Sequence, residues 1–210
     1  MEKEAIFMGK YKKIAGLLLT LFFIYALLYF SFKEKDIFWY LYTFTLLVGI
    51  AIAIIYGKFK DQLSTWQFIV FGIGYGTILY GIVRLGYLLI TKIDTDSDKT
   101  IARFLETYGP NNLWHYLLLV LIIVLGEELF WRGFIQQYIQ NYVSPINAVI
   151  ITSLLFALSV AISGFWLGVI AAFVAGLVLG FLYEWKKSIP LIIITHEVFI
   201  LLLFMILPLH

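Results

Sequence analysis

The chain contains no cysteine, four prolines and few charged residues. Without cysteine it can form neither a disulfide nor a zinc finger, and it cannot use a thiol in catalysis. Charged residues make up 13% of the chain and hydrophobic residues 62%, whereas about a quarter of the residues of a soluble domain are charged. This composition predicts an integral membrane protein. The formal net charge of +2 is spread over the loops and indicates no nucleic-acid partner.

Long hydrophobic runs predict an all-α fold, a multi-pass transmembrane helix bundle with about seven spans. A helix needs about 20 apolar residues to cross the bilayer. The first run is expected to be a membrane anchor, because no small-residue cleavage site follows it. Residues 133–145 mix glutamines with apolar side chains and are expected to form a helix along the membrane interface. The expected spans cover residues 14–32, 37–56, 68–91, 113–131, 146–162, 165–183 and 189–207.

Two of these spans are rich in small residues, which allow close approach of helices in membranes. The third span contains Gly72, Gly74, Gly76, Gly81 and Gly86. The sixth places small residues at every fourth position, namely Gly164, Gly168, Ala172, Gly176 and Gly180. Both spans are therefore predicted to pack tightly against other helices.

The distribution of lysine and arginine favours a cytoplasmic N-terminus. With that orientation the cytoplasmic side collects Lys3, Lys10, Lys12, Lys13, Lys58, Lys60, Arg132, Lys186 and Lys187. The opposite side carries Lys33, Lys35, Lys92, Lys99 and Arg103. We expect a multi-pass protein of a plasma membrane, that of a bacterium, with membrane lipid around it.

Two adjacent carboxylates, Glu127 and Glu128, stand at the end of the fourth hydrophobic run. A charged side chain at that depth costs about 2.5–3.5 kcal/mol, so the pair needs a cation, a proton, a metal or water. Glu128 and Arg132 are four residues apart and share a helix face, whereas Glu127 points about 100° away. Either the cluster caps a membrane helix with an ion pair, or Arg132 holds Glu128 while Glu127 takes part in chemistry.

His196 lies in the seventh span. In the expected topology it has the same depth in the membrane as Glu127. Both are expected about 8–9 Å below the cytoplasmic face. They could share a metal, a water or a hydrogen bond, although an intramembrane histidine is also commonly a polar tie between helices. Arg84, inside the third span, is expected either to snorkel to the interface or to pair with Glu127 or Glu128.

The segment Glu127-Glu128-Leu129-Phe130-Trp131-Arg132 resembles the EExxxR signature of the CPBP (Abi) family, membrane proteins similar to type II CAAX prenyl proteases. The resemblance covers about residues 114–204. It implies an Abi-type core in residues 113–210, preceded in residues 1–112 by N-terminal transmembrane helices and a polar extracytoplasmic loop. Val160 stands where the FxxxH motif of the family has its histidine, and Ile200 stands where the HxxxN motif has its asparagine.

The resemblance also implies roles for individual residues. In family members with complete motifs, the first glutamate and the FxxxH histidine are taken to activate the attacking water, with or without zinc, and the HxxxN residues to stabilise the oxyanion. Candidate catalytic residues are therefore Glu127, Glu128, Arg132 and His196, and a zinc site would use Glu127 and His196. Valine and isoleucine can neither bind a metal nor donate a hydrogen bond. Glu197, next to His196, is a candidate substitute for the catalytic groups missing at positions 160 and 200.

Three functions stay open. The first is a pseudoprotease that binds a membrane peptide or protein partner without cutting it, as in bacteriocin immunity or cell-envelope regulation, which are roles that the family suggests. The second is an active intramembrane endopeptidase whose site is rebuilt with Glu127, His196 and Glu197. The third is a small channel or transporter lined by Arg84 and the glutamate pair, although no internal repeat supports it. The apolar residues at 160 and 200 favour the first.

Overall fold

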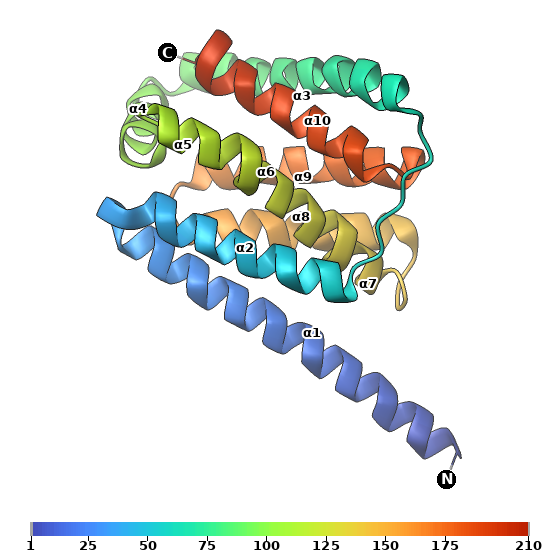
Figure 1. Cartoon of the computed structure of the whole chain (residues 1–210). Coiled ribbons are helices and arrows are strands. Elements are labelled where there is room, and N and C mark those ends of the chain that lie inside the picture. The colour runs from blue at the N-terminus through green and yellow to red at the C-terminus, as the bar shows by residue number, and fades with distance from the viewer. Residues whose placement is uncertain (1, 210) are drawn as a thin grey trace.

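The computed structural model describes residues 2–209 and forms a bundle of helices (Figure 1). Separate helices are α1 (Glu2–Lys33), α2 (Phe38–Tyr56), α3 (Thr65–Ile93), α4 (Asp96–Tyr108), α8 (Pro145–Ala161), α9 (Trp166–Lys186) and α10 (Ile189–Leu201). A short 3₁₀ turn, Lys35–Ile37, precedes α2. The side chains of Lys3, Lys10, Lys12 and Lys13, on which the expected orientation depends, lie outside the described residues.

The fourth span is one continuous helix that contains two π-helical segments. It consists of α5 (Leu113–Leu118), a π-helical segment Leu119–Ile123, α6 (Val124–Glu128), a second π-helical segment Leu129–Gln136, and α7 (Gln137–Ile139). A π-helical segment, Leu202–Ile206, also continues α10. π-Helical turns are rare in proteins, and those that do occur are often found at functional sites. Here they lie on both sides of the glutamate pair.

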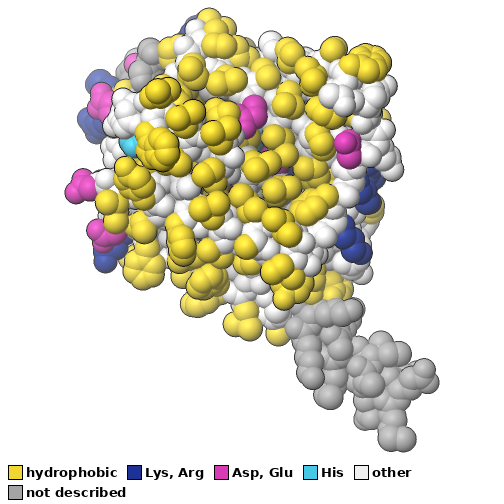
Figure 2. All heavy atoms as spheres, viewed as in Figure 1, with side chains coloured by type: hydrophobic (Ala, Val, Ile, Leu, Met, Phe, Trp, Pro, Cys, Tyr) yellow, Lys and Arg dark blue, Asp and Glu magenta, His cyan; other side chains and the backbone are white. Residues whose placement is uncertain are grey.

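In the described part of the chain, six helices are long and apolar enough to cross a membrane, and Pro145–Ala161 is a shorter apolar helix beside them. This confirms the predicted multi-pass bundle. Hydrophobic side chains cover most of the face shown in Figure 2, and the basic side chains visible there lie toward its edges. The six longer spans are Ile14–Lys33, Lys35–Tyr56, Thr65–Ile93, Leu113–Ile139, Trp166–Lys186 and Ile189–Ile206.

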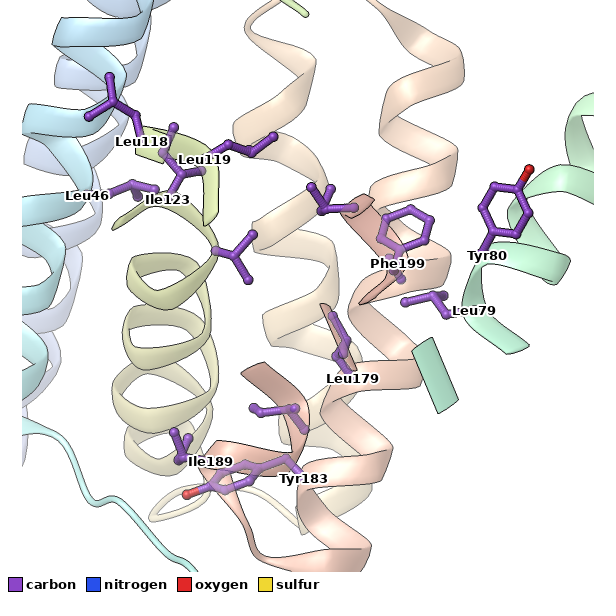
Figure 3. Packing of buried hydrophobic residues seen from close by; sticks show 14 of the residues in the cluster. Leu46, Leu79, Tyr80, Leu118, Leu119, Ile123, Leu179, Tyr183, Ile189 and Phe199 are labelled. Atoms are coloured by element: carbon purple, nitrogen blue, oxygen red, sulfur yellow. The ribbon is translucent and has the colours of Figure 1, made fainter. Parts of the chain in front are cut away.

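Buried side chains from several spans meet between the helices. Figure 3 shows Leu46 of α2, Ile123 of the fourth span, Leu79 of α3, Leu179 of α9 and Phe199 of α10 pointing into this common core. Helices far apart in sequence are therefore packed together, and residues of α2 and α3 reach the centre of the C-terminal half.

The small-residue face of α9 packs against α8, as predicted. A Cβ atom added at Gly176 would lie 3.0 Å from Cβ of Ser153, and one at Gly180 would lie 2.8 Å from Cγ1 of Val149. Neither position has room for a larger side chain without a shift of α8. Gly164 does not take part, because nothing lies within 4 Å of its added Cβ.

The glycines of α3 divide into two groups. A Cβ atom added at Gly72 would lie 2.5 Å from Cγ2 of Ile194, and one at Gly76 would lie 2.6 Å from the carbonyl oxygen of Thr195. These two glycines allow α10 to lie directly on α3, as the two top helices in Figure 1 show. The prediction of close approach is wrong for the other three, since nothing lies within 4 Å of a Cβ added at Gly74, Gly81 or Gly86.

The prediction of an interfacial helix over residues 133–145 is also wrong. The fourth span continues to Ile139, and its residues from Arg132 to Gln136 are buried. Gln136 fits this position because its Nε2 donates to the carbonyl oxygen of Gly180, at 3.2 Å. Arg132 accordingly belongs to the interior and not to the basic residues that the sequence analysis assigned to the cytoplasmic side.

The loop of residues 57–64 crosses the end of the bundle between α2 and α3, and we call it the crossing loop (Figure 1). The backbone N–H of Lys58 donates to Gly133 at 2.9 Å, and that of Ile189 donates to Lys60 at 2.9 Å. These hydrogen bonds place the loop at the same end of the bundle as the turn between α9 and α10.

At the opposite end, α4 covers the helix ends. The Ser97 hydroxyl donates to the Asp94 carboxylate at 2.7 Å, and this hydrogen bond lowers the pKa of Asp94. The Tyr87 hydroxyl of α3 donates to Asp98 at 2.6 Å. The apolar side of α4 faces inward, where Phe104 stacks on Phe165 with 4.2 Å between the ring centroids.

Candidate active site

Glu128 is fully buried and is contacted from two helices. Nη1 of Arg132 donates to its Oε1 at 2.9 Å, and Nδ1 of His196 lies 2.8 Å from the same oxygen. The contact with Arg132 is the one that the four-residue spacing predicts. Because His196 is on α10, Glu128 also ties α6 to that helix.

Glu127 points to a different side of α6 and is almost as buried, at 8% exposure. Its Oε1 accepts a hydrogen bond of 2.6 Å from the Tyr42 hydroxyl, and its Oε2 lies 3.9 Å from Nε2 of His196. The imidazole of His196 therefore directs one ring nitrogen toward each carboxylate. The structure thus brings together all four candidate residues, Glu127, Glu128, Arg132 and His196.

Tyr42 is a member of this cluster that the sequence did not reveal. It lies in α2, 85 residues before Glu127. Its signal in the sequence is a tyrosine within an apolar span, because a buried hydroxyl there requires an acceptor. The identity of that acceptor depends on the packing of α2 against α6.

Arg132 also contacts α8. Its guanidinium carbon lies 4.8 Å from the centroid of the Phe156 ring, within the range of a cation–π interaction. The arginine is 1% exposed, so this ring and Glu128 replace its water shell. Its position supports a structural role in holding Glu128 rather than contact with a ligand.

A cavity of about 540 Å³ reaches this cluster from within the bundle. Glu127 and His196 line it, and so do Val160 and Ile200. The two positions at which the resemblance leads one to expect histidine and asparagine therefore face the same space as the retained glutamate and histidine. The remaining walls are largely apolar, and α4 contributes Ile101, Phe104, Leu105 and Tyr108 at its end of the bundle.

The described residues do not fit a catalytic zinc site. Such a site takes three protein ligands, and no three His, Asp or Glu side chains of the described chain come together in a way that could hold a metal ion. Glu127 and His196 alone supply two. Glu197 follows His196 directly, so it projects about 100° further round α10 and not toward Glu127.

Arg84 does not pair with the glutamates. Its Nη1 donates to the carbonyl oxygen of Pro208 at 2.9 Å, and its guanidinium carbon lies 5.6 Å from the centroid of the Tyr87 ring. The hypothesis of a polar path lined jointly by Arg84 and the glutamate pair therefore loses its geometric basis.

Residues 109–202 match the model of the family described as type II CAAX prenyl endopeptidase Rce1-like. The C-terminal part of this chain is therefore similar to that family. The match confirms the family resemblance predicted from EExxxR, and the Rce1-like segment contains Glu127, Glu128, Arg132 and His196. Tyr42 lies outside it. Searches of curated proteins and of solved structures gave no match.

Proposed function

We propose that this Rce1-like membrane protein is a pseudoprotease, which binds a membrane-embedded peptide segment or protein partner in its cavity without cutting it efficiently. One observation carries the proposal. Val160 and Ile200 line the cavity together with Glu127 and His196, so the cavity is retained while two of the positions expected to bear catalytic groups are apolar.

The chemistry of peptide hydrolysis makes these two replacements costly. A positioned general base contributes about 10²–10⁴ in rate, and one oxyanion donor about 10²–10³. Neither valine nor isoleucine can supply a proton, a lone pair or a hydrogen bond. A rate lower by about 10⁴-fold or more is expected when both groups are missing.

Binding does not need the missing groups. A peptide that leaves regular helical structure inside a membrane must satisfy its backbone N–H groups. The Glu127 carboxylate, held by Tyr42 on one oxygen, can accept such a hydrogen bond, and the apolar walls can receive hydrophobic side chains. The roles that the family suggests, bacteriocin immunity and cell-envelope regulation, would act through this binding.

The test restores the missing groups. Purified protein in proteoliposomes is given a library of internally quenched transmembrane peptides, and cleavage by wild type is compared with that by the double variant Val160→His/Ile200→Asn. We expect cleavage to appear at least about 10²-fold above wild type. The matched control is Val160→Ala/Ile200→Ala, which changes the same sites without polar groups and should remain inactive.

A second candidate function is an active endopeptidase. One arrangement favours it, because the Glu127 carboxylate lies 3.9 Å from the His196 imidazole at the cavity wall. This candidate predicts that the wild-type protein itself cleaves peptides and that Glu127→Gln abolishes the cleavage. That result would replace the pseudoprotease proposal.

For the orientation we propose a cytoplasmic N-terminus in a bacterial plasma membrane. With Arg132 assigned to the interior, the sequence still places eight basic residues on the cytoplasmic side and five on the other. The hydrogen bonds of the crossing loop support the grouping of Lys58 and Lys60 with Lys186 and Lys187 at one end of the bundle.

A further inference from the structure

Glu197 is a carboxylate in the middle of a membrane span. The span Ile189–Ile206 has 18 residues and a mean hydropathy of 2.5. Glu197 lies about 12–14 Å from either end of it at 1.5 Å per residue. The residue is half-buried, and it is absent from the lining of the cavity. It therefore stands outside the candidate active site.

The neighbours of Glu197 on α10 show which way its side chain faces. His196 contacts Glu128, whereas Thr195 and Val198 contact α3 at Gly76. Viewed along α10, the side chain of Glu197 projects between the direction of His196 and that of Thr195 and Val198. Ile193 and Leu201, four residues away on either side, are half-buried as well. Together Ile193, Glu197 and Leu201 form a stripe on the outer side of α10, which we call the Glu197 stripe.

The Glu197 carboxylate forms no ion pair among the described residues. Its Oε2 is shielded from solvent and makes no hydrogen bond, and no described lysine or arginine lies within 4.0 Å of it. The two arginines within the described spans are engaged elsewhere, Arg84 with Pro208 and Arg132 with Glu128. A carboxylate without an ion pair at this depth is costly, and no described lysine or arginine is placed to compensate it.

We propose that the Glu197 stripe is a docking surface for a transmembrane helix of another protein that carries a lysine or arginine at mid-membrane depth. Charge complementarity selects the basic residue, because a cation is the partner that neutralises the carboxylate while the apolar residues on either side pack against the incoming helix. A second copy of this chain is the poorer partner, because its arginines within the described spans are already bonded. The proposal does not depend on the proposed function of the cavity.

The experiment uses the full chain in lipid vesicles and a 23-residue leucine–alanine helix with lysine at its centre. Because the chain has no cysteine, Lys35→Cys at an exposed turn accepts one fluorophore for energy transfer from a labelled peptide. We expect the lysine peptide to bind about tenfold more tightly than peptides with leucine or glutamine at the centre. Glu197→Gln should reduce that ratio to about one.

Glu106→Gln is the matched control, because it makes the same change at an exposed position of α4, and it should leave the preference unchanged. Gel filtration in detergent confirms that each variant remains folded and monodisperse. Equal binding of the three peptides by wild type would overturn the proposal, as would a lysine preference that survives Glu197→Gln. Loss of self-association in Glu197→Gln, with no peptide preference in wild type, would assign the stripe to a second copy instead.

Discussion

Nδ1 of His196 lies 2.8 Å from Oε1 of Glu128, and this contact joins α10 to α6 in the middle of the bundle. Both side chains are buried, at 5% and 0% exposure. The carboxylate is compensated mainly by Arg132, four residues along the same helix. The polar cluster therefore has a structural part, Glu128 with Arg132, and a part that faces the cavity, Glu127 with His196.

Replacement of Arg132 by alanine should destabilise the protein by about 3–5 kcal/mol, because it leaves the Glu128 carboxylate buried without its cation. Unfolding in mixed detergent micelles, followed by circular dichroism, measures the change. Lys99→Ala is the control, since it breaks an exposed ion pair with Asp96 and should cost about 1 kcal/mol or less. Equal stability of the two variants would show that the buried pair is not required.

Tyr42→Phe should weaken the coupling between α2 and Glu127. The variant removes a hydroxyl that donates to Glu127 at 2.6 Å and should cost about 1.5–3 kcal/mol of stability, because hydrogen bonds to charged groups have that value. A double-mutant cycle with Glu127→Gln isolates the interaction. Tyr40→Phe, at an exposed position, serves as the control, and a coupling energy near zero would contradict the contact.

Gly76→Ala should destabilise the contact of α3 with α10 by about 1–3 kcal/mol, which is the usual effect of overpacking. The added methyl group would lie 2.6 Å from the carbonyl oxygen of Thr195. Gly74→Ala on the same helix has nothing within 4 Å of the new carbon and should be neutral or slightly stabilising. Thermal unfolding of both variants in one detergent makes the comparison, and a larger loss at Gly74 would contradict this packing.

The orientation can be measured with single cysteines, because the chain has none of its own. Lys60→Cys and Lys187→Cys should be labelled by a membrane-impermeant maleimide only after the cells are opened. Lys35→Cys and Lys99→Cys should be labelled in intact cells. The reverse pattern would place the N-terminus outside.

Local patterns allowed the sequence to predict much of this arrangement. Hydrophobic runs located the spans, the four-residue spacing predicted the contact of Glu128 with Arg132, and the spacing of Gly176 and Gly180 predicted a close helix neighbour. Each of these depends on residues within one helix. Local periodicity is therefore sufficient to find them.

Relations between helices were harder to predict. Gln136 suggested an interface, yet its Nε2 donates to the backbone carbonyl oxygen of Gly180 on another helix, and the residue lies in the interior. The same limitation hid Tyr42, whose acceptor is 85 residues away. The closer partner of His196 was also not predicted. The expected depth placed His196 beside Glu127, whereas its shorter contact, at 2.8 Å, is with Oε1 of Glu128.

The packing of α10 on α3 has a consequence for biosynthesis. α3 ends at Ile93 and its partner begins at Ile189, so Gly72 and Gly76 enter the membrane long before the residues that will cover them are made. At the usual 5–20 residues per second the interval is roughly 5–20 s. During that time lipid, a neighbouring protein or the insertion machinery must cover the glycine face of α3, until α10 is inserted and replaces it.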